Sequence, residues 1–268
     1  TTSDLEGSCI ASFSDFDFND RLIEIGDGNA SGENFFSNSE NGITGAGDMN
    51  YEIKRNTFGN ENDVSESILK YCISLDNNNS LNKEIQINNN NEFYDYTFGI
   101  AIFNPLGKVT IKGNDFFNGV YPNSPTGFEG IAINVNRITP AALWGSEISD
   151  NTIGVASNSG TVTPIQPRMG IRLSQINSVK VETNNIFFTH SIAPNQHHIG
   201  IWAENCSELR IADFNKIDNY FPNFQAVLAS MVTGLRLDAS PFSCTEQNIF
   251  TRMSIGMHIT GNSMFNSF

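Results

Sequence analysis

The stretch GIRLSQINSVKVETNNIFF, residues 170–188, contains the two short phrases that decide the fold. The first phrase, GIRL at Gly170–Leu173, reads Gly, aliphatic, any residue, aliphatic. The second phrase reads aliphatic, two other residues, Asn, any residue and then Ile or Phe, here as Val181, Asn184 and Ile186. In both phrases apolar residues alternate with other residues before Gly, Asn, Ser or Asp, and this pattern predicts short β-strands that end in turns.

The first phrase recurs along most of the chain. It reads GIAI at Gly99–Ile102, GIAI at Gly130–Ile133, GIWA at Gly200–Ala203, GLRL at Gly234–Leu237, GMHI at Gly256–Ile259, and CISL at Cys72–Leu75 with Cys in place of Gly. Successive phrases are spaced too unevenly for a short rigid repeat. Such spacing suits stacked units that differ in the length of their turns, none of which buries its apolar face alone.

The second phrase repeats between these positions and places Asn at a nearly constant offset. Its other copies are Ile53/Asn56/Phe58, Ile87/Asn91/Phe93, Ile111/Asn114/Phe116, Ile148/Asn151/Ile153 and Ile211/Asn215/Ile217. Asn tolerates left-handed backbone geometry at turns, and its amide bonds local backbone groups. We therefore expect the amides to stack in a hydrogen-bonded ladder, as in cross-β assemblies. The alternative is that Asn only fills exposed turns.

The alternation of GIxI with IxxNxI resembles the pectate-lyase-like right-handed β-helix superfamily of secreted polysaccharide-active and surface proteins. The resemblance covers residues 42–268 and implies an all-β chain, a right-handed parallel β-helix solenoid of about eight coils. Residues 1–41 fit the pattern poorly, so we expect an irregular N-terminal coil or cap there. The last repeat begins at Gly256 and stops at Phe268, and we expect more chain or a partner to cover that strand edge.

Composition limits the classes of partner. The net charge of −14 repels phosphate backbones and anionic membranes, so we expect no nucleic-acid partner. No run of residues is apolar and long enough for a transmembrane helix. The four cysteines, Cys9, Cys72, Cys206 and Cys244, lack metal-ligand spacing. They fit either two disulfides or buried free thiols, so the cysteines leave the compartment open.

If the aliphatic residues of the first phrase point inward, the residues between them form two outward files. The first file contains Arg172, Trp202, Arg236 and His258, preceded by Ala101 and Ala132 in earlier repeats. The second contains Ser174, Glu204, Asp238 and Thr260. The chemically dense part of this face is therefore expected in the last four repeats.

Two interpretations of this face remain open. In the first, Arg172, Trp202 and Arg236 bind a glycan, and Glu204, Asp238 and His258 are candidate catalytic groups. In the second, the two arginines stack on Trp202, and the two carboxylates neutralise them. The resembled enzymes carry motifs that this chain lacks, since Arg210-Ile211-Ala212 is a poor RIK and Gly256-Met257-His258 is not GHG. We therefore favour the second interpretation.

Metal binding has little support in the sequence. Asp27, Asn29 and Ser31 match the first half of a calcium loop, but its last position would be Asn38 instead of Glu. We expect no cofactor, with calcium at this loop as the alternative. His197 and His198 have no acidic residue at ligand spacing, and we expect them to be inert loop residues.

These observations predict a non-catalytic β-helix scaffold or adhesin-like segment of an exported bacterial surface protein, located outside the cell or on its surface. Its expected partners are a polysaccharide or another surface protein. The first alternative is a polysaccharide lyase or glycoside hydrolase with its site around Trp202. The second alternative is a passive cargo or partner-binding module.

Overall fold

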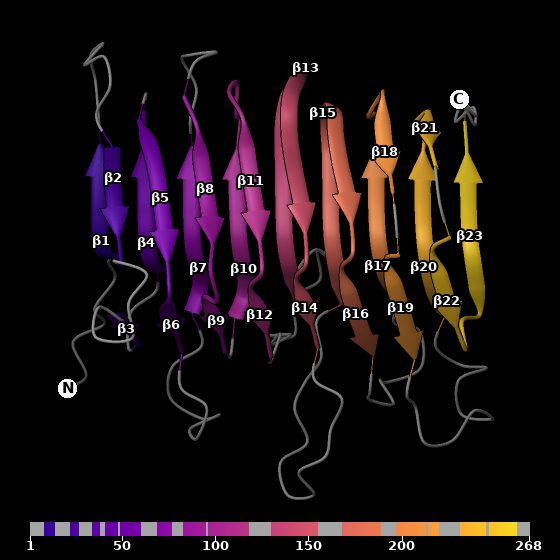
Figure 1. Ribbon diagram of the computed structural model, residues 1–268, viewed down its shortest axis with the longest axis horizontal. Coiled ribbons are helices and arrows are strands. Elements are labelled where there is room, and N and C mark those ends of the chain that lie inside the picture. Colours follow the sequence, from indigo (N-terminus) through magenta and orange to yellow (C-terminus); the bar gives the residue numbers. More distant parts are fainter. Residues whose placement is uncertain are drawn as a thin grey trace, which may run out of the picture.

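The computed structural model describes fourteen segments of the chain. They are residues 8–13, 22–26, 34–37, 41–47, 49–59, 69–76, 83–94, 96–117, 130–154, 168–188, 197–212, 214–219, 231–244 and 247–261. These segments form strands and turns, and none of them is helical. The strands lie side by side along the longest axis of the molecule, roughly in chain order from one end to the other (Figure 1).

The strands form three rows in two sheets. Row A, part of the 15-stranded sheet, consists of β1 (Ser8–Phe13), β4 (Asn41–Ala46), β7 (Leu69–Asp76), β10 (Tyr96–Phe103), β13 (Ile131–Ser149), β15 (Met169–Glu182), β17 (His197–Glu204), β20 (Met231–Asp238) and β23 (Ile255–Thr260). Row B, in the same sheet, consists of β2 (Leu22–Ile25), β5 (Asn50–Lys54), β8 (Ile85–Asn88), β11 (Val109–Lys112), the distal parts of β13 and β15, β18 (Leu209–Ile211) and β21 (Phe242–Ser243). Row C, the 8-stranded sheet, consists of β3 (Asn34–Phe36), β6 (Asn56–Phe58), β9 (Glu92–Phe93), β12 (Asp115–Phe116), β14 (Thr152–Ile153), β16 (Asn185–Phe188), β19 (Lys216–Asn219) and β22 (Ile249–Thr251).

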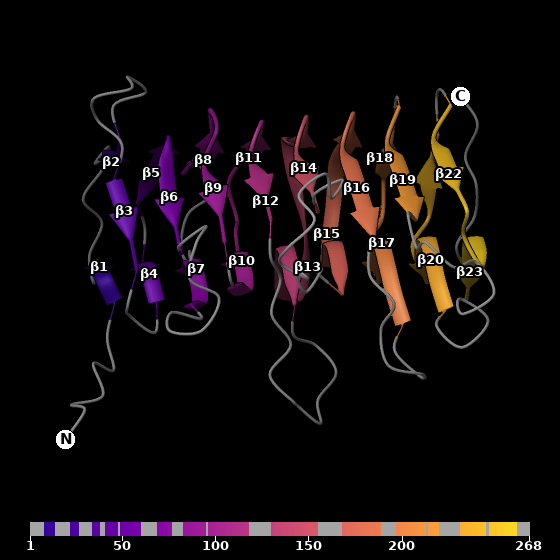
Figure 2. The same ribbon diagram turned by 90° about the horizontal axis from the view of Figure 1, so that it is seen from below.

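Each strand pairs in parallel with the equivalent strand of the next repeat. In row A, for example, Ile171 of β15 lies opposite Ile133 and Ile201. Row C follows the same order along the same axis, as the turned view shows (Figure 2). The predicted all-β chain of parallel strands is confirmed, and the pairing is consistent with a parallel β-helix.

The glycine of the first phrase lies where a row C side chain crosses the interior. A Cβ atom added to Gly200 would lie 2.6 Å from the carbonyl oxygen of Gly234 and 2.6 Å from Cδ1 of Ile217. The same crowding exists between Gly99 and Phe116 in an earlier repeat. Glycine therefore recurs because a larger residue would force rows A and C apart.

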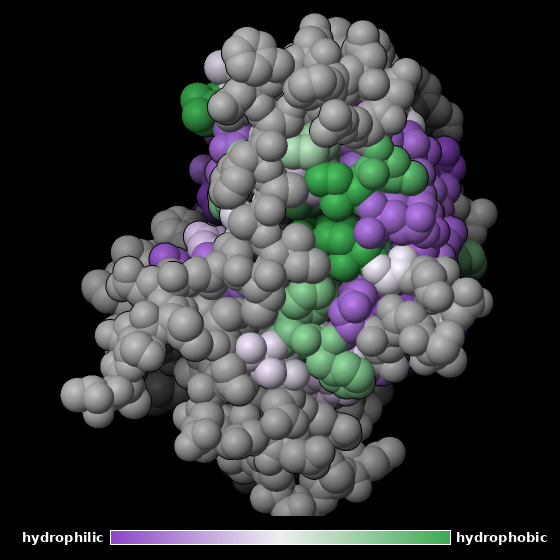
Figure 3. All heavy atoms as spheres, turned by 90° about the vertical axis from the view of Figure 1, so that its left-hand side faces the viewer, coloured by the Kyte–Doolittle hydropathy of each residue, from purple (hydrophilic) through white to green (hydrophobic). Residues whose placement is uncertain are grey.

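Row C supplies a continuous apolar stack to this interior. The centres of successive rings, those of Phe36, Phe58, Phe93 and Phe116, lie 4.8, 5.0 and 4.5 Å apart, and the ring planes are nearly parallel. All four rings are buried. A view from the N-terminal end shows hydrophobic residues gathered near the middle of the described cross-section, with hydrophilic residues beside them (Figure 3). Parallel pairing therefore stacks like residues on like.

The expected asparagine ladder is present at the turn between rows B and C. From Asn34 to Asn215, the amide Nδ2 of each ladder residue donates to Oδ1 of the ladder residue in the next repeat, over distances of 2.8 to 3.1 Å. The ladder residues are Asn34, Asn56, Asn91, Asn114, Asn151, Asn184, Asn215 and Asn248. The alternative of exposed turn asparagines is wrong, since the six residues from Asn56 to Asn215 are completely buried.

One detail of that prediction needs correction. The ladder asparagines themselves do not take the left-handed conformation; for the six from Asn56 to Asn215, the preceding residue does. Asp150, with φ of 55°, precedes Asn151, and Thr183, with φ of 52°, precedes Asn184. This sharp turn directs the following Asn side chain to the interior, where its amide bonds backbone carbonyls as well as the next amide.

The first 41 residues contribute strands to both sheets. The strands β1, β2 and β3 pair in parallel with β4, β5 and β6. The region that the sequence places in an irregular coil or cap therefore continues the strand rows where the structure describes it. The calcium-loop candidates Asp27, Asn29 and Ser31 lie outside the described residues.

The sequence aligns Gly130 with Gly99 and Gly170 of the neighbouring repeats, but the strand pairing is shifted by two residues. Ile133, and not Ile131, lies opposite Ile100 and Ile171, so Ala132 occupies the glycine position. Ala132 is completely buried and does not belong to the first outward file. Asn134 takes that place opposite Arg172.

Two neighbouring asparagines test the ladder. Replacing Asn184 with Ala leaves the donors of Asn151 without their acceptor in the interior, so we expect a loss of about 3 kcal/mol or more in the free energy of unfolding. The matched control is Asn185→Ala, because Asn185 is only partly buried and should cost less than about 1 kcal/mol. Urea unfolding measures both. Equal losses in the two variants would contradict a special role for the ladder.

Two glycines of the same phrase test the interior crowding. We expect Gly200→Ala to lower stability by about 1 to 3 kcal/mol, because the added methyl group meets the Gly234 carbonyl and Ile217. Gly256 has no atom within 4 Å of an added Cβ, so Gly256→Ala should change stability by less than about 0.5 kcal/mol. Thermal unfolding of the two variants provides the comparison, and a large loss in Gly256→Ala would refute this explanation.

Candidate functional site

The first outward file of row A brings the predicted residues together. Arg172 of β15 pairs with Trp202 of β17, Trp202 pairs with Arg236 of β20, and Arg236 pairs with His258 of β23. The four side chains come from four consecutive repeats, as the alternation of inward and outward residues predicted.

Trp202 lies between two guanidinium groups. The Cζ atom of Arg172 is 5.0 Å from the centre of its ring, and Cζ of Arg236 is 4.7 Å from it. The indole also belongs to an apolar cluster with Met169 and Ile199, and the residue is only 7% exposed. Each cation–π contact of this kind contributes about 1 kcal/mol. Both ring faces are occupied within the protein, which leaves little of the indole for a sugar ring.

The second file holds the carboxylates of the site. Glu204 forms an ion pair with Arg172, with Oε2 and Nη2 3.3 Å apart. Asp238 accepts hydrogen bonds from the Trp202 indole N–H at 2.8 Å, from Nε of Arg236 at 2.8 Å and from the Thr260 hydroxyl. The carboxylates of the second file therefore neutralise the two arginines of the first file.

The protonation of Asp238 fits an electrostatic role. Burial acts to raise the pKa of its carboxyl group, but the hydrogen bonds from Thr260 and Trp202 and the charge of Arg236 outweigh burial. The pKa lies below its usual value of 3.8 as a result. A general acid for glycoside cleavage needs a raised pKa, so Asp238 is poorly suited to donate a proton.

The histidines occupy two different environments. His258 is exposed at the outermost strand of row A, next to the exposed side chain of Met257. His197 and His198 open β17, whereas the sequence indicated a loop. His198 is completely buried, with its ring centre 5.0 Å from that of Phe188.

Cysteines and metal-binding groups add no site within the described residues. Cys72, Cys206 and Cys244 are free thiols; Cys72 and Cys206 are buried, as the buried-thiol interpretation expects, whereas Cys244 is only partly buried. Burial raises the pKa of Cys206 to about 11 and makes this thiol unreactive. No cluster of three or more His, Cys, Asp or Glu side chains is arranged for a metal ion in the described segments. Among the described residues, there is no helix that is long and apolar enough to cross a membrane.

Sequence interpretation missed Trp144, the other tryptophan of the chain. Trp144 is 72% exposed on β13 and borders an open pocket with Glu147, Lys180 and Arg210. Its signal in the sequence is the long spacer between the first and second phrases of that repeat, since Ile148 follows Gly130 by 18 residues, whereas Val181 follows Gly170 by 11.

Comparisons with protein-family models, curated proteins and solved structures found no match to this chain.

The lowered pKa of Asp238 allows a pH-dependent test of whether its ionised carboxylate stabilises the fold. A carboxyl group with a lowered pKa in the folded state stabilises the protein above its unfolded-state pKa, and this contribution disappears as pH falls through the folded-state pKa. We expect Asp238→Asn to be less stable than the parent at neutral pH. The difference between the two should shrink as pH falls below 3.8.

Urea unfolding of both proteins at several pH values between about 7 and 2.5 measures this difference, because the other carboxyl groups titrate alike in the two chains. A stability difference that stays constant over the whole range would contradict the assigned role of the ionised Asp238.

Proposed function

We propose that the chain is a non-catalytic scaffold, a right-handed parallel β-helix segment of an exported bacterial surface protein. Two observations support this assignment. The strands of every described row pair in parallel, and the recurring GIxI and IxxNxI phrases resemble those of the pectate-lyase-like superfamily. A stack of repeats that each contact only their neighbours gives an elongated body, which suits the separation or display of other groups.

The observation that carries the non-catalytic assignment is the pairing inside the outer face of row A. Arg172 forms an ion pair with Glu204 of the next strand, Arg236 forms one with Asp238 of its own strand, and Trp202 is enclosed between the two arginines. Catalytic groups need polar atoms that remain free to meet a substrate. On this face, most polar side-chain groups instead bond to one another, either within a strand or between neighbouring strands.

The alternative of a polysaccharide lyase or hydrolase would use Glu204, Asp238 or His258. Glu204 and Asp238 are adjacent in register, which is the kind of carboxylate pair that glycoside cleavage requires. The three hydrogen bonds to Asp238 and its lowered pKa argue against this use. No observation favours the passive cargo module over the scaffold.

An activity screen tests the proposal. We expect no release of reducing ends and no unsaturated products when the protein is incubated with pectin, alginate, xylan, mannan or cellulose. Asp238→Asn, Glu204→Gln and the parent protein should then give the same background signal. Turnover by the parent would refute the non-catalytic function. Its loss in either variant would place the active site on the outer face of row A, whereas turnover unaffected by both would place it elsewhere on the protein.

A further inference from the structure

The strand β13 departs from the regular pairing of rows A and B. Between Asn136 and Ser146, its chain advances ten residues while β15 advances five, from Ser174 to Val179. The register shifts occur between Asn136 and Ala141 and between Ala142 and Ser146. Bulges of this kind redirect side chains and are common beside functional sites.

The extra residues form a ridge, defined here as residues 137–145. Two of its large apolar side chains point into solvent, with Ile138 at 78% and Trp144 at 72% exposure. Trp202, the chain's other tryptophan, is 7% exposed. An exposed indole adds nothing to the stability of the core, so its place on a bulge suggests a binding role.

Several contacts hold the ridge in a defined position. The guanidinium of Arg137 is largely buried and donates from Nε to the carbonyl oxygen of Thr139 at 2.8 Å and from Nη1 to that of Pro105. The Ser146 hydroxyl accepts the backbone N–H of Val109 at 2.8 Å and anchors the far end. These bonds give the ridge a fixed shape before any ligand arrives, which lowers the entropic cost of binding.

Beside the ridge, an open pocket of about 380 Å³ lies between β13, β15 and β18. Its lining combines the Trp144 ring with two carboxylates, Glu147 and Glu208, and two cations, Lys180 and Arg210. A volume in this range is at the lower end for small-molecule sites. The pocket is separate from the file of Arg172, Trp202 and Arg236.

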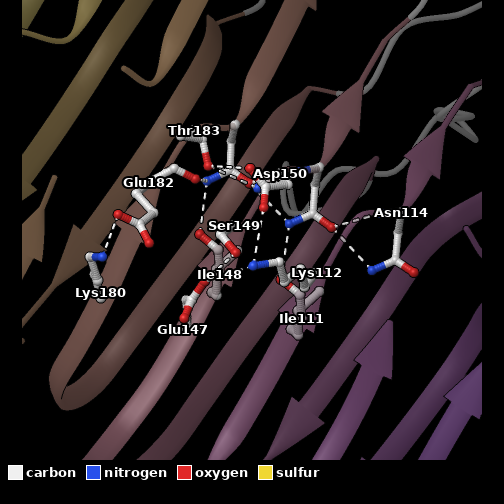
Figure 4. A network of polar contacts seen from close by, with 12 residues as sticks. Ile111, Lys112, Asn114, Glu147, Ile148, Ser149, Asp150, Lys180, Glu182 and Thr183 are labelled. Carbon is white, nitrogen blue, oxygen red and sulfur yellow. Dashed lines mark hydrogen bonds and ion pairs between the residues drawn. The ribbon is translucent and has the colours of Figure 1, made fainter. Parts of the chain in front are cut away.

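The polar groups of the pocket are positioned by neighbours but keep solvent-facing atoms. Lys180 forms an ion pair with Glu182, and Glu147 lies beside Ser149 and 3.6 Å from Nζ of Lys112 (Figure 4). Glu208 accepts a hydrogen bond from the Ser178 hydroxyl at 2.5 Å. The lining therefore offers both donors and acceptors, with balanced charge, around a flat aromatic surface.

We propose that this pocket binds a neutral saccharide, with one sugar ring stacked on Trp144 and its hydroxyl groups bonded to Glu147, Glu208 and Arg210. A sugar ring presents C–H groups to the indole face and hydroxyl groups at its rim, which matches an aromatic surface edged by mixed polar groups. The balanced lining and the net charge of −14 disfavour an anionic ligand. The inference rests on the proposed function only in that the saccharide is bound and not cleaved.

Binding can be measured with an immobilised panel of neutral oligosaccharides of glucose, galactose, mannose, xylose and N-acetylglucosamine, with oligogalacturonate and sialyllactose as acidic probes. We expect the parent protein to bind at least one neutral probe and to bind the acidic probes less. Trp144→Ala should raise the dissociation constant at least about tenfold, because it removes the stacking surface.

The matched control is Phe35→Ala, since Phe35 is an equally exposed aromatic residue on β3. It should leave binding unchanged, and both variants should keep the parent's urea midpoint. The proposal is overturned if no neutral probe binds, if acidic probes bind more tightly, or if Trp144→Ala binds like the parent. Release of reducing ends from a bound probe would refute the non-catalytic function and leave the pocket assignment intact.

Discussion

A buried amide has donors and an acceptor that must all be satisfied, and in this protein each ladder asparagine satisfies those of its neighbours. Asn184, for example, accepts from both the backbone and the side chain of Asn151 and donates to Asn215 and to two backbone carbonyls. Such bonds form only when consecutive repeats stack one strand spacing apart with no sliding along the strands. The ladder therefore sets the register on which the packing of all three rows depends.

The fixed register determines which side chains become neighbours elsewhere. In the interior it places Phe58 on Phe93 and brings the row C side chains against the glycines of row A. On the outer face it places Trp202 between Arg172 and Arg236. Like residues tolerate this stacking when they are apolar, whereas charged residues need counter-charges in the adjacent file, which Glu204 and Asp238 supply.

Repetition also explains why an irregular segment stands out. Where β13 adds residues between Asn136 and Ser146, the flanking strands still pair in register, so the surplus chain must leave the sheet. The ridge and the pocket beside Trp144 arise from this mismatch. The polar side chains on the outer face of row A mostly bond to one another, whereas the irregular segment of β13 leaves the Trp144 ring open to solvent.

Asparagine spacing predicted the ladder from Asn56 to Asn215 because hydrogen bonding at a buried turn requires one residue type at one offset. The same spacing missed Asn34 and Asn248, since the residues before them do not keep that offset from an aliphatic residue. The phrase at Gly130 was misaligned by two positions, because a local pattern cannot show which of two alternating aliphatic residues meets its partner in the next repeat.

The sequence by itself determined the parallel all-β architecture, the inward and outward alternation and the order Arg172, Trp202, Arg236 along one face, because these follow from local periodicity. Only the tertiary structure decided that Trp202 is enclosed and that Trp144 is open. Those outcomes depend on side-chain contacts between repeats and on where surplus residues leave a sheet, and neither is encoded within a single phrase.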